Sequence, residues 1–473
     1  MITIIKHQIT EGLLDAKFMF MAVLVLFAFV ANGLIYSAHY ENAMEDWRES
    51  IANTTRQLES RTDNLQSISA YAQRMVKPPS ALAFIADGGD DRIPNRILVN
   101  AFVLTDPQVQ TRRNDMFALL PNIDWVFIIG SLMTLLTILM SFSSISGEKH
   151  NGTLSLLLSY PVSRITLFMG KYLGQLIVLI LILVLGILLN LTVLMFSNAL
   201  PLTEQILVTI GWIFILSVLC LSFVLLTGIA VSSMVHQPAI ALVVLMVFWL
   251  IGVIAVPGIA RLTGENSVDV TTPFELERES DASFDNIWYN APEGAGRWMS
   301  NPEYAKSDTA RIRYETVKKI VEEDQKINDR VNDERVKQAG LIRLLAFAAP
   351  NGLLDDAMQR FCGTGIHGYR AFWDTTRRYQ QLLHNFTVER DRLDPDSPHT
   401  VYTWWYSATQ YTYSMKPVEF STFPRWHVLW EKGGLYNDQE FPFIHFILFI
   451  AGNLQMAILA FIALTRYDPR QIH

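Results

Sequence analysis

The chain has 473 residues, of which 51% are hydrophobic and only 18% charged, a balance typical of a membrane protein with several spans that also carries polar domains. Its formal net charge of -7 gives no basic surface for nucleic acid. Two cysteines, Cys220 and Cys362, are too few for a disulfide framework.

Six apolar runs are each about 20 residues long, the length that crosses a bilayer as a helix. Before them, residues 1–17 place Ile5, Ile9 and Leu13 at helical spacing, which predicts an amphipathic helix lying in the membrane interface. The predicted spans are residues 18–36, 125–145, 172–196, 205–231, 239–256 and 441–464. The sequence therefore predicts a mainly α-helical polytopic membrane protein.

Positive charge indicates the orientation, because short loops rich in Lys and Arg stay on the cytoplasmic side. One orientation places all of the short basic segments together, at Lys6, Lys17, Lys149, Arg164, Lys171, Arg466 and Arg470. In this orientation both termini are cytoplasmic, including the tail 465–473. The polar segments 37–124 and 257–440 are then extracytoplasmic, and we expect them to form a mixed, mostly helical outer domain.

The outer segments carry their own signals. Residues 77–95 contain proline and glycine pairs that predict a short strand and a turn. Residues 302–345 and 355–393 have the composition of two helical arms, which Pro350 separates. The segment 344–354 between them is apolar, so we expect it to pack on the membrane or on the first outer segment.

The loop 146–171 has a polar start and a leucine-rich middle that Gly152 and Pro161 bracket. The apolar piece, with Leu154 and Leu157, is too short to span a bilayer. It is therefore expected to lie at the membrane surface or to insert into a partner. An ordinary amphipathic surface loop is the simpler alternative.

The order of residue types in this loop resembles the first cytoplasmic loop of ABC-2 type transporter permeases. The matching residues are Glu148, Gly152, Thr153, Leu157, Pro161, Val162, Ser163, Arg164, Gly170 and Lys171. More loosely, residues 77–95 and 344–370 resemble the bacterial members with large periplasmic inserts, the group that carries the domain of unknown function DUF3526.

The resemblance implies a permease subunit in the bacterial inner membrane, whose loop forms a coupling helix that docks into a separate ATPase. Two ATPase subunits and a second permease, identical or homologous, would complete the transporter. ATP and Mg would bind in the ATPase, with no cofactor in this chain.

The same resemblance implies roles for the loop residues. Glu148 and Lys149 would make polar contacts with the ATPase, and Leu154 and Leu157 would fill its groove. Gly152 would permit close backbone approach.

Thr153 and Pro161 also belong to the motif. Arg164 and Lys171 would anchor the next span at the anionic inner leaflet. His236 and Gln237, in the short loop before the fifth span, are candidates for a second contact on the same side.

Motifs for catalysis are missing from the sequence. The chain has no Gly-x-x-x-x-Gly-Lys-Ser/Thr loop, so any ATP hydrolysis is expected in a partner rather than here. It also lacks the His-Glu-x-x-His and Gly-x-Ser-x-Gly patterns. The histidines scattered through the outer segments are expected to be structural or solvated, without a bound metal.

Charged residues are almost absent from the predicted spans, which argues against ion-coupled transport. The polar exceptions include Asn32, Asn190, Asn453 and Gln455, which either line a substrate path or hydrogen-bond neighbouring helices. Pro257 is expected to end the fifth span, as a gate or as a plain membrane exit.

Two other functions remain open. The chain can act as a mechanotransmitter that moves a periplasmic partner without passing a substrate. It can also be a membrane-anchored receptor or enzyme that works through its outer domain, which predicts a clustered polar pocket there and no ATPase.

Overall fold

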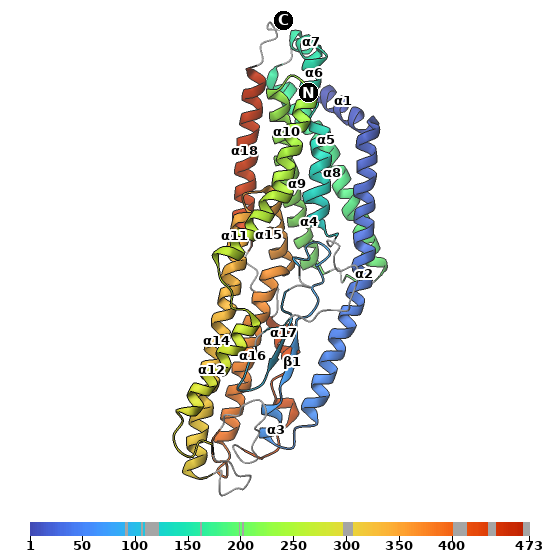
Figure 1. The fold of residues 1–473 in the computed structure, drawn as a ribbon. Helices are drawn as coiled ribbons and strands as arrows, with labels where there is room; N and C mark the ends of the chain where they lie inside the picture. The colour runs from blue at the N-terminus through green and yellow to red at the C-terminus, as the bar shows by residue number, and fades with distance from the viewer. Residues whose placement is uncertain are drawn as a thin grey trace.

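A computed structural model shows an elongated molecule with long apolar helices at one end and a polar domain at the other (Figure 1). The N-terminus lies at the apolar end, together with the short helices α6 (Ser146–His150) and α7 (Thr153–Ser159) and the end of α18 (Phe443–Thr465). The structure describes the whole chain except residues 90–92, 106, 109–122, 161–162, 198, 201–202, 297–305, 401–413, 434–440 and 467–473.

Six helices in the described part of the chain are long and apolar enough to cross a membrane, which confirms the predicted mainly α-helical polytopic architecture. They comprise α2 (Ala16–Glu59), the segment from α4 (Trp125–Phe127) to α6 (Ser146–His150), α8 (Arg164–Phe196), α9 (Glu204–Met234), the segment from α10 (Pro238–Leu250) to α11 (Val256–Ser267), and α18 (Phe443–Thr465).

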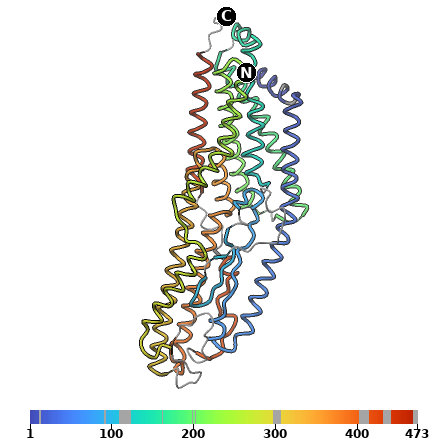
Figure 2. The backbone as a smooth tube through the Cα atoms, viewed as in Figure 1, coloured from blue at the N-terminus to red at the C-terminus, as the bar shows by residue number. Residues whose placement is uncertain are grey.

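The first two helices meet at Asp15, whose side chain accepts a hydrogen bond from Lys17 N and so caps the start of α2. α1 (Ile2–Leu14) lies against α8, where a Cβ atom on Gly174 would come within 2.8 Å of Gln8 Cβ. α2 then continues as one helix of 44 residues, about 66 Å long at 1.5 Å per residue. Figure 2 shows it running from the apolar end into the polar domain.

Two spans contain π-helical turns. In the second span, η2 (Ile128–Met133) separates α4 from α5 (Thr134–Ser141). In the fifth span, η3 (Ile251–Ala255) joins α10 to α11. The predicted helix end at Pro257 is therefore wrong. The proline is the second residue of α11, directly after the π-helical turn, and the helix continues to Ser267.

The third span also begins earlier than predicted, at Arg164 rather than at residue 172. Ser163 caps it, because its side chain accepts a hydrogen bond from Thr166 N. Eight residues of the expected loop are thus the first two turns of α8. This brings the loop residue Arg164 into a rigid helix.

The polar domain contains a small antiparallel sheet, β1 (Gln73–Val76) with β2 (Arg96–Val99), in which Gln73 pairs with Val99. The strand predicted within 77–95 is misplaced, since in the described residues the strands flank this segment. Residues 81–85 form turns, and Ser80 Oγ donates to the Cys362 carbonyl at 2.9 Å.

Helices complete the polar domain, and a cluster of aromatic and aliphatic side chains forms a second core beneath them. The helices are α3 (Leu65–Ala70), α12 (Pro273–Tyr289), α14 (Asp308–Ala346), α15 (Pro350–Cys362), α16 (Gly365–Arg392), the 3-10 turn η4 (Phe420–Thr422) and α17 (Trp426–Gly433). The two predicted arms correspond to α14 and to α15 with α16. Both cysteines are buried and unpaired.

Candidate functional site

The loop after the second span folds into two short helices, α6 and α7 (Thr153–Ser159), at the end of the molecule that also holds the N-terminus (Figure 1). Gly152 joins them with φ of +71°, a left-handed conformation that favours glycine. The glycine of the motif is therefore required by the turn itself.

Ser232, near the end of α9, holds the start of α6. Its hydroxyl accepts hydrogen bonds from Ile145 N at 3.0 Å and Ser146 N at 2.9 Å, and it donates to the Phe142 carbonyl at 2.8 Å. These bonds satisfy N–H groups that a helix start leaves without partners. No local pattern predicts this role, because Ser232 lies 87 residues from Ile145 in the chain.

Two loop residues that were expected to contact an ATPase are instead used inside the chain. Glu148 Oε1 lies 2.7 Å from Lys171 Nζ, and Lys171 also donates to the Ser144 carbonyl at 2.6 Å. The Lys149 ammonium donates to the Ser233 carbonyl. Lys171 is 2% exposed, so the prediction that it anchors the span at lipid headgroups is wrong.

The leucines of α7 face different sides. Leu154 is fully buried in the main core of the spans, so in this structure it cannot also fill a partner's groove. Leu156 and Tyr160 are each 62% exposed, and Leu157 is half-buried. The apolar surface available to a partner is therefore centred on Leu156 rather than on Leu154.

The other motif residues flank this surface. Thr153 is exposed, and its hydroxyl donates to the Glu148 carbonyl at 3.3 Å. Arg164 reaches across to the end of α18, where it donates to the carbonyls of Leu464 at 2.9 Å and Thr465 at 2.7 Å. Pro161 lies outside the described residues.

His236 and Gln237 are both exposed in the turn between α9 and α10. They follow Ser233, which accepts the hydrogen bond from Lys149 of α6, and α10 lies against α6. The two residues therefore belong to the same end of the molecule as α7, and their predicted contact with a partner stays a prediction.

Two of the asparagines in the spans bind one another near the polar domain. Asn190 Nδ2 donates to Asn32 Oδ1 and to the Phe29 carbonyl, both at 2.7 Å. Asn32 Nδ2 donates in turn to the Phe84 carbonyl at 3.1 Å. Both side chains are buried, so they join helices and the polar domain in the way that the simpler alternative expected.

The other two polar residues, both in the sixth span, behave differently from each other. Asn453 donates to the Leu219 carbonyl at 2.9 Å and accepts from Ser222, so it joins α18 to α9. Gln455 is exposed on the outer face of α18. A substrate path through these residues stays a prediction.

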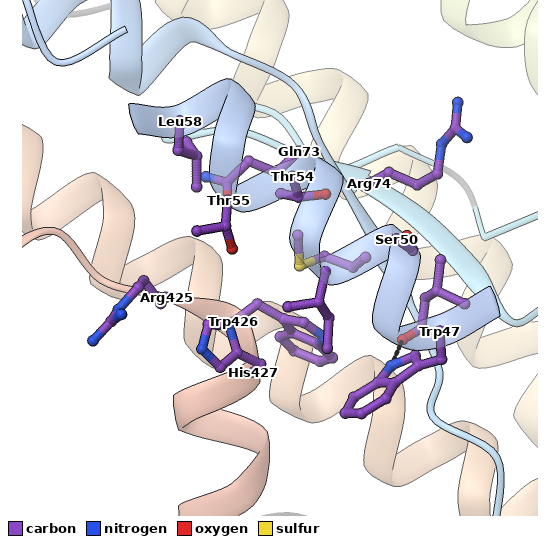
Figure 3. A pocket seen from close by; sticks show the side chains of 13 residues that line it. Trp47, Ser50, Thr54, Thr55, Leu58, Gln73, Arg74, Arg425, Trp426 and His427 are labelled. Carbon is purple, nitrogen blue, oxygen red and sulfur yellow. Dashed lines mark hydrogen bonds between the residues drawn. The ribbon is translucent and has the colours of Figure 1, made fainter. Parts of the chain in front are cut away.

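A groove in the polar domain lies between one face of α2, strand β1 and the start of α17 (Figure 3). Its space of about 370 Å³ is partly open to solvent. Trp426 lines it, and no described residue accepts a hydrogen bond from the indole Nε1–H of this buried side chain. The side chains of Arg74 and Arg425 point away from it (Figure 3).

The lining of this groove contains no carboxylate and no thiol. Among the described residues there is also no group of three or more His, Cys, Asp or Glu side chains that could hold a metal.

Six helices in the described part of the chain can cross a membrane by length and composition, and the short helices α6 and α7 form the loop after the second of them. The model of the ABC-2 family transporter proteins matches residues 2–286, more than half of the chain, and the chain belongs to this family. Residues 300–417 match the model of a domain of unknown function, DUF3526. The family is one of ABC permeases, which implies ATPase partners in a transporter complex.

Two curated relatives share a short segment with this chain. The probable ABC transporter permease protein NosY of Pseudomonas aeruginosa is 44% identical over 55 residues, and the protein with the same description from Stutzerimonas stutzeri is 40% identical over 55 residues. Each match covers 12% of this chain and 20% of the relative. The chain thus matches about one fifth of the relatives' length.

Proposed function

We propose that this chain couples ATP hydrolysis in a separate ATPase subunit to the export of a substrate, or its movement, across the inner membrane. The observation that carries the proposal is the construction of α6 and α7. Ser232 and Lys171 brace the segment from inside, while Leu156 and Tyr160 leave an apolar face exposed. A rigid helix with an exposed apolar face is suited to dock into a groove.

In this proposal the end of the molecule with α6 and α7 is cytoplasmic, and the polar domain is periplasmic. Support comes from the charges, since Lys6, Lys149 and Arg164 all belong to elements at that end (Figure 1). ATP and Mg bind in the ATPase. The chain itself contributes the surface of α7, with Thr153, Leu157, His236 and Gln237 around it.

Two ATPase subunits and a second permease, a copy or a homologue, complete the proposed assembly. The fifth and sixth spans favour a second permease, because little of their surface is covered by this chain. Only 11% of the most apolar stretch of the fifth span and 17% of that of the sixth span is buried. Gln455 lies exposed on the sixth span, where contact with lipid alone would leave its amide without partners. Lipid covers the remaining apolar surface.

Mechanotransmission is the second candidate, and α2 favours it. This single helix runs from the spans into the polar domain without a break (Figure 2). Asn32 and Asn190 were candidates to line a substrate path, but their side chains are hydrogen-bonded to each other and to the backbone. In this version, ATP moves the polar domain against a periplasmic partner, and no substrate crosses the membrane.

Co-purification tests the proposal. The tagged chain is expressed together with a candidate ABC ATPase subunit and extracted in mild detergent. Leu156→Asp places a charge on the exposed face of α7 and should release the ATPase. Leu393→Asp makes the same change at an exposed leucine of the polar domain, and should retain it. Equal retention by both variants would refute docking through α7.

A further inference from the structure

The junction between the spans and the polar domain is built around α15. Leu354, Ala357 and Met358 of this helix are fully buried, and they belong to the same core as the spans. At its start, Asn351 lies against the π-helical turn of the second span, where a Cβ atom on Gly130 would stand 3.0 Å from Asn351 Oδ1. α15 is therefore a polar-domain helix inserted among the ends of the spans.

Asp356, on α15, has a side chain only 3% exposed and meets four cationic or imidazole groups. His445 Nε2, in the first turn of α18, lies 2.7 Å from its Oδ2. The other partners are Arg343 of α14 at 3.0 Å, Arg360 of α15 at 3.1 Å and His367 of α16 at 3.2 Å. One carboxylate thus joins the sixth span to three helices of the polar domain.

The charge of Asp356 is held in place by these partners. Burial alone would raise the pKa of its carboxyl group. The hydrogen bonds from His367 and His445 and the charge of Arg343 overcome this effect and hold the pKa below its ordinary value. Burial also lowers the pKa of His367. The carboxylate therefore stays ionised at neutral pH and accepts the bond from His445.

The opposite end of α18 is held by the loop that carries α7. Arg164, the first residue of α8, donates to the carbonyls of Leu464 and Thr465 in the last turn of α18. A helix leaves its last carbonyls without partners, and the positive guanidinium also suits the negative end of the helix dipole. Both ends of α18 are thus bonded to other elements, to the start of α8 at one end and to α15 of the polar domain at the other.

Between its two ends, α18 is supported along one side by α9, where Asn453 bonds Ser222 and the Leu219 carbonyl. The helix has 23 residues and is about 35 Å long. It contains no proline, and it is α-helical throughout, whereas the second and fifth spans each contain a π-helical turn. α18 therefore has neither a proline nor a π-helical turn, the two features that most often kink a helix.

We propose that α18 carries motion from the α7 loop to the polar domain, with Arg164 as its cytoplasmic joint and the Asp356–His445 bond as its joint to the polar domain. This inference rests on the proposed coupling to an ATPase. Asp356 and His445 act as positioning residues, because they neither touch ATP nor contact the ATPase. If the bond is removed, the loop still responds to ATP, but the polar domain does not follow.

The test compares two variants of His445. His445→Phe removes the Nε2–H donor but keeps an aromatic ring against Phe347, which lies 5.2 Å away between ring centroids. His445→Gln restores an amide donor. Asp356 retains Arg343 and Arg360 in both variants, so its charge stays paired. Asp356→Asn, which weakens the joint from the other side, is the second probe.

The complete complex with its ATPase is placed in nanodiscs, and spin-label distances are measured with and without ATP and Mg. Labels at the exposed positions Glu41 and Glu277 report on the polar domain, and labels at His150 and Met234 report on the α7 loop. The wild type and His445→Gln should change both distances. His445→Phe and Asp356→Asn should change only the loop distance.

A full ATP response of the polar domain in His445→Phe would overturn the inference. A wild type whose loop responds while its polar domain stays still would overturn this inference alone. A wild type whose loop does not respond to ATP would overturn the proposed function, and this inference with it.

Discussion

Glu148 Oε1 lies 2.7 Å from Lys171 Nζ, which ties the polar start of the α7 loop to the third span. Since Lys171 is almost fully buried and also bonds the Ser144 carbonyl, the pair acts as an internal brace. Movement of α6 therefore has to displace α8, and the loop cannot swing freely at the membrane surface.

Lys171→Met should destabilise the protein more than Glu148→Gln. The methionine leaves the Glu148 charge and the Ser144 carbonyl without their partner, whereas the glutamine still accepts from Lys171. We expect a loss of about 2 kcal/mol for Lys171→Met, below the usual range for a fully buried pair because Glu148 is partly exposed. Thermal unfolding in detergent measures it.

The double variant Glu148→Gln/Lys171→Met completes this cycle. It should be more stable than the sum of the single changes predicts, because the uncompensated carboxylate is gone. Strict additivity would show that the brace contributes nothing.

Ser232→Ala should loosen the start of α6. The alanine removes the acceptor for Ile145 N and Ser146 N, a loss of about 1–2 kcal/mol on the scale of helix caps. Amide hydrogen exchange over residues 145–150 should become faster. The neighbouring Ser233→Ala is a matched control, because that hydroxyl donates only to Ile229 of its own helix. Equal exchange rates in both variants would show that the Ser232 hydroxyl does not hold the start of α6.

The pH dependence of stability should change at Asp355. Burial raises the pKa of its carboxyl group from 3.8 to about 6, although a hydrogen bond from Gln359 opposes the rise. The folded pKa lies above the unfolded one, so the stabilisation is complete below pH 3.8 and is lost as pH rises through 6. Its full size is roughly 2–3 kcal/mol.

Asp355→Asn stays neutral at every pH, so it should gain stability over the wild type between pH 4.5 and pH 7.5. The melting temperatures of both proteins are compared at each pH. Glu277→Gln, at an exposed position of α12, corrects for general charge effects. If the difference in melting temperature between Asp355→Asn and the wild type does not vary with pH, the pKa of Asp355 is not raised.

Topology is tested by cysteine labelling in intact cells. A cysteine at position 277 should react with an impermeant reagent from outside, and one at position 150 only after the cells are opened. Both positions are exposed, and the native Cys220 and Cys362 are buried and give little background. The reverse pattern would invert the proposed orientation.

The sequence predicted the spans well, because a membrane helix needs about 20 apolar residues and little else resembles that signal. It predicted the details of the loop less well. α7 is apolar at Leu154, Leu156, Leu157 and Leu158, so no periodicity shows which side faces the core. The structure buries Leu154 and exposes Leu156, and the choice depends on neighbours far away in the chain.

The polar domain shows the same limit. The segment 344–354 is unusually apolar for an outer segment, yet only the fold shows that its end enters the core of the spans as part of α15. The bond between Asp356 and His445 joins residues 89 positions apart, and neither lies in a motif. Such contacts depend on tertiary structure, which a single sequence does not encode in any local pattern.

The most direct test of the central claim is site-specific photo-crosslinking in native membranes. A photoreactive amino acid is placed at position 156, on the exposed face of α7, and at position 393 of the polar domain as a control. We expect an adduct between position 156 and the ATPase subunit, and none from position 393. An ATPase adduct from position 393, or no adduct from position 156 while the ATPase is expressed, would contradict docking through α7.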